Sequence, residues 1–150
     1  MTTIDPRMIQ VEIPLRLVAP DATALPVRGS FIYDPADPYA ISVTFSAEAD
    51  SAEADSADAV TWTLSRELLA AGLGGPSGLG DVRVWPWQTA RGDFVALALA
   101  SPDGCALFEV PRLALVRFMR RTYIVVPRGC ETDHLDVDGA ISRLLADQEY

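Results

Sequence analysis

The stretch IQVEIPLRL, residues 9–17, decides the fold class of this 150-residue chain. Its odd positions, from Ile9 to Leu17, are all apolar, while its even positions hold glutamine, glutamate, proline and arginine. This period of two is typical of a β-strand with one buried face. Pro14 has no backbone N–H to donate, so we expect the strand to lie at a sheet edge or to contain a bulge.

The same alternation recurs along the chain and predicts six further strands. The first two flank the sequence DPADP, residues 34–38, whose prolines and aspartates favour a tight turn, so these strands form a predicted hairpin. The last two are apolar at consecutive positions, as central strands covered on both faces are. The six predicted strands span residues 27–33, 39–45, 60–64, 82–87, 94–100 and 105–110.

Helix signals occur at three places. Ser65 can cap a short helix, with Gly72 suited to the left-handed residue just past its end. Pro111 fits the first position of a second helix that runs to about Arg121. Asp136 can cap a third, which carries an apolar stripe at helical spacing. Strands, a short helix, more strands and two helices predict an α+β fold with mostly antiparallel sheets and about three helices.

The composition describes a single domain. With 150 residues and 49% hydrophobic side chains the chain can bury one core, so we expect one domain over residues 1–150. The net charge of −9 argues against general attraction to phosphate or anionic lipid. The longest apolar run, residues 94–100, is far shorter than the roughly 20 residues of a membrane-spanning helix. The N-terminus also lacks a secretory signal pattern, so we expect a cytoplasmic protein without a membrane span.

A short acidic repeat lies between two predicted strands. The sequence AEADS occurs twice in succession, over residues 47–56, and is followed by ADA. Residues 47–59 therefore carry five acids and no large apolar side chain, which cannot offset the entropy cost of ordering. We expect a mobile, solvated loop, and an acidic docking arm is the alternative.

The chain lacks a recognisable catalytic constellation. It has one histidine, His134, and its two cysteines, Cys105 and Cys130, are far apart in the sequence and are expected to be free thiols. Asp136 and Asp138 are explained by the dipole of the third predicted helix without a metal ion. The glycine-rich stretch after the first helix matches no nucleotide-binding motif. We therefore predict no catalytic, cofactor-binding or metal-binding residues and no enzymatic activity.

Two tryptophans form the first candidate binding feature. Trp85 and Trp87 fall on the same face of a predicted strand. Exposed aromatic side chains on a sheet can grip a protein partner or stack on the bases of a single strand of nucleic acid. The alternative is that one or both pack in the core or in a subunit interface.

A basic segment forms the second candidate binding feature. Residues 111–128 contain five arginines and no acid, so this segment has a charge of +5 while the rest of the chain has −14. Cations near a helix C-terminus are favoured by the helix dipole alone. The functional alternative is a surface for an anion or an acidic partner. With the tryptophans, Arg117, Arg120 and Arg121 complete the candidate partner-binding set.

Several short strings together resemble one family. The Tyr33-Asp-Pro-Ala-Asp-Pro-Tyr-Ala40 and Gly80-Asp-Val-Arg-Val-Trp-Pro86 strings are the most specific. With them, the chain from about residue 11 to 146 resembles the SsgA-like sporulation and cell division proteins of filamentous spore-forming bacteria. The supporting strings are Leu25-Pro-Val27, Arg66-Glu-Leu-Leu-Ala-Ala-Gly-Leu73 and Ser101-Pro-Asp-Gly104.

The resemblance implies a non-enzymatic regulator of septum formation. Members of the family act with the cell division machinery, mark septum sites and in some cases recruit FtsZ, while others affect wall remodelling. The implied partners are cell division proteins, FtsZ or another SsgA-like protein, and the implied location is the cytoplasm with recruitment to the septum. The family fold is similar to the Whirly class of single-stranded nucleic-acid binders and assembles as a homo-oligomer, with a trimer favoured. Single-stranded nucleic-acid binding is therefore the alternative function, although the acidic charge of the chain makes nucleic acid an unlikely partner.

Overall fold

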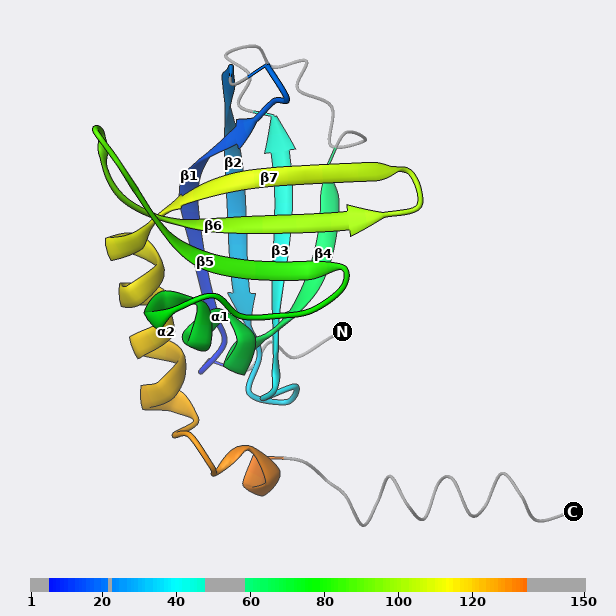
Figure 1. Cartoon of the computed structure of the whole chain (residues 1–150). Helices are drawn as coiled ribbons and strands as arrows, with labels where there is room; N and C mark the ends of the chain where they lie inside the picture. The colour runs from blue at the N-terminus through cyan, green and yellow to red at the C-terminus, as the bar shows by residue number, and fades with distance from the viewer. Residues whose placement is uncertain (1–5, 22, 48–58, 135–150) are drawn as a thin grey trace, which may run out of the picture.

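The computed structural model describes residues 6–21, 23–47 and 59–134 (Figure 1). These residues form seven strands, two α-helices and a 3₁₀ helix. In chain order the elements are β1 (Ile9–Val18), β2 (Ala24–Tyr33), β3 (Ala40–Ala47), β4 (Val60–Ser65), α1 (Arg66–Gly74), β5 (Val82–Thr89), β6 (Gly92–Ser101), β7 (Gly104–Pro111), α2 (Arg112–Val125) and the 3₁₀ helix Glu131–His134.

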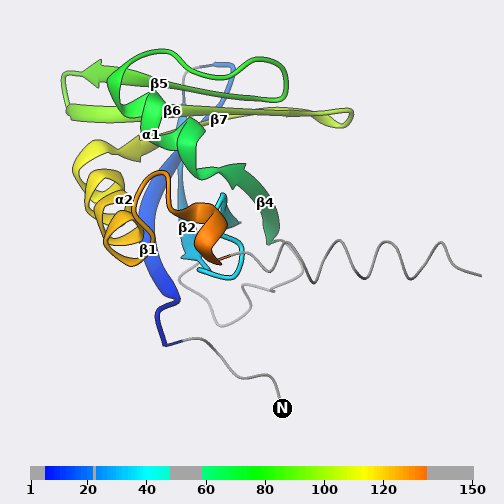
Figure 2. The same cartoon turned by 90° about the horizontal axis from the view of Figure 1, so that it is seen from below.

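All seven strands belong to one sheet in the order β4-β3-β2-β1-β7-β6-β5, and every neighbouring pair is antiparallel. The predicted α+β class with antiparallel strands is confirmed. The strands form one sheet and not several, because β1 and β7 pair over Arg16–Val18 and join the two halves. The half made of β5–β7 crosses over the half made of β1–β4, so that the sheet folds into two layers (Figures 1 and 2).

Pro14 lies where the sheet tolerates it. β1 is central in the strand order and pairs with β2 along its whole length, but it pairs with β7 only from Arg16 onward. Pro14 therefore lies in the part of β1 that pairs with β2 alone, so its missing N–H interrupts no pairing with β7. The expected edge character is local and does not apply to the whole strand.

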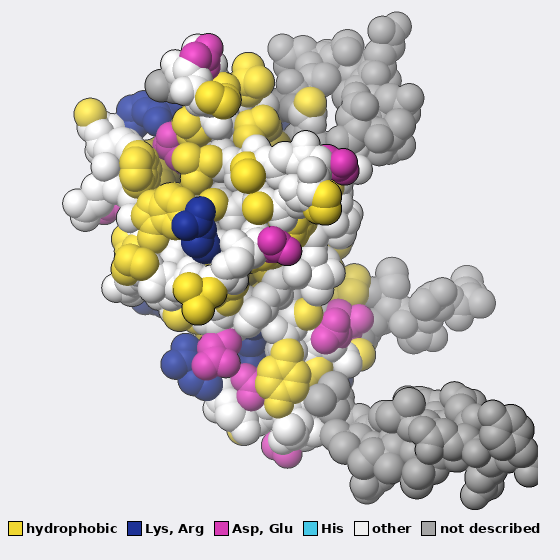
Figure 3. All heavy atoms as spheres, turned by 45° about the vertical axis from the view of Figure 1, so that its right-hand side comes forward, with side chains coloured by type: hydrophobic (Ala, Val, Ile, Leu, Met, Phe, Trp, Pro, Cys, Tyr) yellow, Lys and Arg dark blue, Asp and Glu magenta, His cyan; other side chains and the backbone are white. Residues whose placement is uncertain are grey.

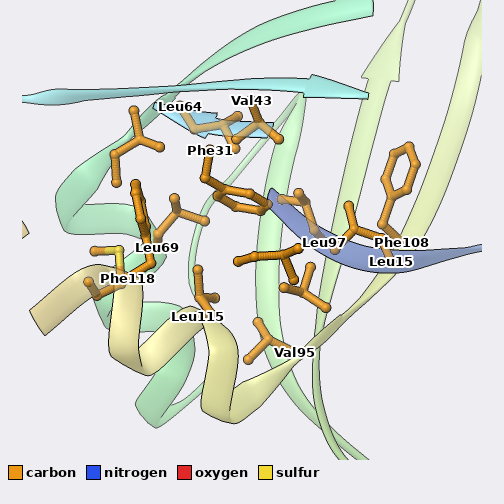
Figure 4. Packing of buried hydrophobic residues seen from close by; sticks show 14 of the residues in the cluster. Leu15, Phe31, Val43, Leu64, Leu69, Val95, Leu97, Phe108, Leu115 and Phe118 are labelled. Atoms are coloured by element: carbon orange, nitrogen blue, oxygen red, sulfur yellow. The ribbon is translucent and has the colours of Figure 1, made fainter. Parts of the chain in front are cut away.

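The core fills the space between the two layers and α2 (Figure 4). Phe31 of β2 meets Phe118 of α2 edge to face with ring centroids 5.6 Å apart, and Phe45 stacks on Phe108 at 4.2 Å. The odd-numbered residues of β1 face this core, as their alternation predicts.

The helices differ in detail from the sequence prediction. The hydroxyl of Ser65 accepts the amide of Leu68 and caps α1 as predicted. Gly72 does not end the helix but lies inside it, packed against Val84 of β5. Pro111 is the N-cap of α2 and not its first helical residue.

Two further expectations remain outside the described residues, namely the third predicted helix from residue 136 and most of the acidic loop 47–59.

Neither α1 nor α2 has the length and hydropathy of a membrane-spanning helix, and the described part of the chain contains no other α-helix.

Candidate functional site

The side chain of Arg66, the first residue of α1, connects both helices and the 3₁₀ helix. It is only 1% exposed. Its guanidinium donates to the carbonyls of Thr122 and Val126 at 3.1 and 2.8 Å, and to Glu131 Oε1 at 2.8 Å. The carbonyl of Thr122 also accepts the amide of Val126 at 2.9 Å, so Arg66 adds a second donor there and supplies the partner of the Val126 carbonyl just past the C-terminus of α2.

Two tyrosine rings enclose the same guanidinium. The Arg66 Cζ atom lies 5.0 Å from the ring centroid of Tyr33 and 4.2 Å from that of Tyr123. Cation–π contacts of this kind strengthen when water is excluded. Burial raises the pKa of Tyr33 to about 12, and its hydroxyl donates to the carbonyl of Pro38 at 2.9 Å. The hairpin turn between β2 and β3 is thereby tied to the helices.

The carboxylate of Glu131 completes this cluster. Its pKa is lowered, first by a hydrogen bond from its own backbone amide and then by the hydrogen bond from Arg66. Its Oε2 atom also accepts the amide of Gly129 at 2.8 Å. At the other end of α2, Arg112 donates to the carbonyl of Leu73 in α1. The helix α2 is therefore fixed to α1 at both of its ends.

The outward face of α2 carries three of the predicted partner-binding residues. Arg117, Arg120 and Arg121 are exposed, and none of them has an ion pair or hydrogen bond within the described residues. Leu113 is 60% exposed and Ile124 is 79% exposed. Positions 113, 117, 120 and 124 follow one line along a helix of 3.6 residues per turn. This basic and apolar surface of five residues is called the α2 face below.

The other two arginines of the basic segment have structural contacts. Arg112 binds the carbonyl of Leu73, and Arg128 lies 5.4 Å from the ring centroid of Tyr123. The charge of +5 inferred from the sequence therefore divides into two arginines with structural contacts and three that have none within residues 6–21, 23–47 and 59–134.

Trp85 and Trp87 lie on the outer face of β5, away from the core. Trp87 is 42% exposed and Trp85 is half-buried. The register places Trp85 beside Ala96 and Trp87 beside Phe94 of β6. Neither helix packs on this face, and Figure 3 shows hydrophobic side chains gathered across it. The expected sharing of one strand face is confirmed, and the alternative of burial in the core is wrong.

The predicted residues form two separate surfaces, because no hydrogen bond, ion pair or ring contact joins the two tryptophans to the three arginines in the described structure. Sequence reasoning missed three residues, Arg66, Leu113 and Ile124. Helical periodicity extended from Arg117 in both directions finds Leu113 and Ile124. Only the family resemblance pointed to the string that contains Arg66.

No metal centre is visible in the described residues, where no group of three His, Cys, Asp or Glu side chains is placed to hold an ion. Cys105 and Cys130 are free thiols, as predicted. The arrangement offers contact surfaces and shows no nucleophile paired with a base among the side-chain hydrogen bonds of the described residues.

Comparison with known proteins gives concordant results. The model of the family described as Streptomyces sporulation and cell division protein, SsgA, matches residues 27–131. The sporulation-specific cell division protein SsgB of Salinispora tropica is 66% identical over 97% of this chain and 99% of its own length. SsgB of Streptomyces coelicolor is 43% identical over 93% of this chain and 96% of its own.

Two solved structures share the fold. An SsgA-like sporulation-specific cell division protein from Thermobifida fusca superposes with a TM-score of 0.78 at 36% identity, covering 95% of this chain and 98% of that one. An SsgB structure linked to longitudinal cell division during sporulation of Streptomyces coelicolor gives 0.75 at 44% identity, covering 85% and 94%. With most of its length matched in sequence and in fold, the chain belongs to the SsgA family of sporulation and cell division proteins.

Proposed function

We propose that this chain is a non-enzymatic regulator of sporulation-specific cell division that acts by binding other proteins through the α2 face. The names of its relatives support a role in sporulation cell division. The observation that carries the proposal is the set of three arginines on α2 that have no partner among the described residues, flanked by exposed Leu113 and Ile124. Apolar anchors beside unpaired arginines are typical of residues that dominate binding energy at interfaces.

The chemistry of the α2 face specifies the partner. Guanidinium groups bind carboxylates with two parallel hydrogen bonds, so the complementary surface is acidic with apolar side chains at helical spacing. FtsZ and other SsgA-like proteins are the proposed partners, and binding at the division site would mark the septum or recruit the machinery. Control of wall remodelling is a further outcome of the same contact. The protein would act from the cytoplasm and concentrate at the septum.

The outer face of β5–β7 has a different proposed role. Its surface includes Trp85, Trp87 and Phe94, with small alanines between the larger side chains, and the ion pair of Arg91 with Glu109 lies beside Phe94. An apolar sheet face that neither helix covers is a natural contact between subunits. We propose that it joins copies of this chain in a homo-oligomer, with a trimer favoured by the family resemblance.

The double substitution Arg117→Glu with Arg121→Glu tests the proposed function. We expect it to weaken binding of purified FtsZ or of a co-expressed SsgA-like protein by at least about tenfold, because attraction becomes repulsion in the interface. Fluorescently tagged protein should lose its septal position in sporulating cells. Arg28→Glu is the control, since Arg28 is exposed on β2 and makes only a 3.9 Å contact with Glu12. Unchanged binding and localisation of the double variant would refute the assignment of the α2 face.

Single-stranded nucleic-acid binding is the competing function, because Trp87 is exposed and three arginines are unpaired. If all three neutralise phosphates, log K falls with log salt at a slope of about −2. With a net charge of −9 we expect affinity weaker than about 10 µM near physiological salt. Submicromolar, salt-dependent binding of single-stranded DNA that the double substitution abolishes would favour this function instead.

A further inference from the structure

The two ends of the sheet differ in how they are protected. Beyond β5, the edge is bridged by two hydrogen bonds between Ser77 and Val84, and Pro86 follows in the strand. Both features hinder the addition of another strand. At the opposite end, β4 has the sequence VTWTLS, which contains no proline, glycine or charge. No described strand pairs with its outer edge.

The backbone groups that face this outer edge follow from the ladder pattern. The amide of Arg66 donates to the carbonyl of Tyr39 at 2.9 Å, on the side of β4 that faces β3. Hydrogen-bonded pairs alternate along an antiparallel ladder. Even-numbered residues of β4, such as Trp62, therefore turn their N–H and C=O groups toward β3. Thr61 and Thr63 turn theirs outward, where a further strand can pair with them.

An apolar cleft of about 480 Å³ lies beside this edge. It lies between one end of the layer β1–β4, with Val60 and Trp62 of β4 at its side, and the end of the β6–β7 hairpin, which extends past β4 in both views (Figures 1 and 2). Successive side chains of a strand point to opposite faces. Every second side chain of a strand added to β4 would therefore enter the cleft beside Trp62. The principal apolar lining residues are Phe45, Val60, Trp62, Leu99 and Phe108.

The charge around the cleft restricts its occupant. Among the described residues that line the cleft, Asp103 is the only charged one. A segment with Lys or Arg next to its apolar residues complements the carboxylate of Asp103, and an acidic segment does not.

We propose that β4 and this cleft bind an extended segment of a partner protein by strand addition. The segment has apolar residues at alternate positions and basic residues at its flanks. Backbone hydrogen bonds to Thr61 and Thr63 align it, and the cleft selects its side chains. The site is separate from the α2 face, which lies on the other side of the molecule and prefers acidic partners (Figure 1). One chain could then hold two partners of opposite charge at the same time.

Peptide selection tests the proposal on the full-length chain. Short random peptides displayed on phage are selected against the immobilised protein, and we expect enrichment of alternate apolar residues with basic flanks. A synthetic copy of an enriched peptide should lose about tenfold in affinity for Thr63→Pro, which removes one outward N–H. Thr63→Ala keeps that N–H and should bind within about twofold of the unaltered chain, and so should the Arg117→Glu, Arg121→Glu variant.

Amide hydrogen exchange of the unaltered chain provides a readout that does not depend on how a proline variant folds. We expect the amides of Thr61 and Thr63 to exchange rapidly alone and to become protected when the enriched peptide is added. Enriched peptides without a period of two, or equal binding by Thr63→Pro, would overturn the proposal. Protection of these amides without peptide would also overturn the proposal. Protection that rises with protein concentration would mean that a second copy of the chain pairs with the edge. Protection that does not depend on concentration would mean that the chain itself covers the edge.

Discussion

At the scale of single residues, Arg66 has the largest set of contacts in the described structure. It is a buried cation whose cost of desolvation is offset by two carbonyls, one carboxylate and two aromatic rings. Removing one member of such a cluster leaves the others buried without a partner. The position of α2 therefore depends on this side chain as well as on the buried apolar residues of the helix.

Replacing Arg66 by leucine should destabilise the fold by about 3 kcal/mol, because Glu131 Oε1 and the carbonyl of Val126 lose their donor and the carbonyl of Thr122 loses one of its two. Urea denaturation followed by circular dichroism measures this loss. Arg28→Leu is the matched control and should cost less than about 1 kcal/mol, as expected for an exposed pair. Equal effects of the two substitutions would show that the buried cluster does not hold the fold together.

Tyr33 should make stability depend on alkaline pH. Because burial raises its pKa to about 12 from an ordinary 10, its contribution is full below pH 10 and is lost as pH rises toward 12. Over this window the urea midpoint of the unaltered chain should fall more steeply than that of Tyr33→Phe, which cannot ionise there. Ultraviolet titration of the folded chain should show one tyrosine that ionises late, and simultaneous ionisation of all four would contradict the burial.

At the scale of elements, the contact of α1 with β5 depends on the absence of a side chain at Gly72. A Cβ atom placed there would lie 2.2 Å from Cγ1 and 2.6 Å from Cβ of Val84. The Cβ atom of Val84 is fixed to its strand, so the helix itself would have to move. The small residue sets the distance between helix and sheet.

Gly72→Ala should therefore destabilise the fold by about 1–2 kcal/mol, in spite of the better helix propensity of alanine. Gly74→Ala, in the same helix with nothing within 4 Å, is the control and should be neutral or stabilising. Adding Val84→Ala should recover part of the loss at position 72. Thermal denaturation of the unaltered chain, Gly72→Ala, Val84→Ala and the double variant completes a double-mutant cycle. Strictly additive changes in stability would exclude the contact between residues 72 and 84 as the cause.

The sequence predicts the elements better than their arrangement. Alternation locates the strands with one buried face, because such burial leaves a period of two in the residues, and unbroken apolar runs locate β6 and β7. It does not show that β1 bridges the two halves of the sheet, because strand order depends on contacts between distant residues. The sequence predicts a helix end at Gly72, because glycine commonly ends helices, whereas in the structure packing against Val84 requires glycine there.

The candidate site is predictable to a similar extent. Composition identifies the arginines of α2, and the spacing of two residues identifies Trp85 and Trp87. In the structure Arg117, Arg120, Arg121 and Trp87 are exposed, and Trp85 is half-buried on the outer face of its strand. Which arginines remain available depends on acceptors elsewhere in the fold, such as Leu73, and no local pattern contains that information. The Whirly resemblance and the partner-binding role remain predictions.

At the scale of the whole molecule, the two layers have outer faces of opposite character. The outer face of β1–β4 includes Gln10, Glu12 and Arg28. That of β5–β7 includes the tryptophans and Phe94, beside the Arg91–Glu109 ion pair. Water solvates the first face at little cost, while the aromatic part of the second gains free energy when another apolar surface covers it. We therefore expect self-association through β5–β7.

Sedimentation at micromolar concentration should therefore show a species larger than the 16.2 kDa chain, with three times that mass favoured. Trp87→Glu should shift the distribution toward the monomer, because it places a charge on the apolar face. Arg28→Glu, on the polar face, should leave the distribution unchanged. A monomer for all three proteins would show that the apolar face has another use.

The attachment of α2 at both ends bears on how related proteins can diverge. Arg66 and Arg112 hold the helix from its buried side, and the exposed positions 113, 117, 120, 121 and 124 contribute nothing to that attachment. Mutations at these positions are therefore nearly neutral for folding and are free to accumulate. After a gene duplication, one copy can acquire a new recognition specificity while its scaffold stays the same, and a set of regulators with different timing can arise without inventing a new fold.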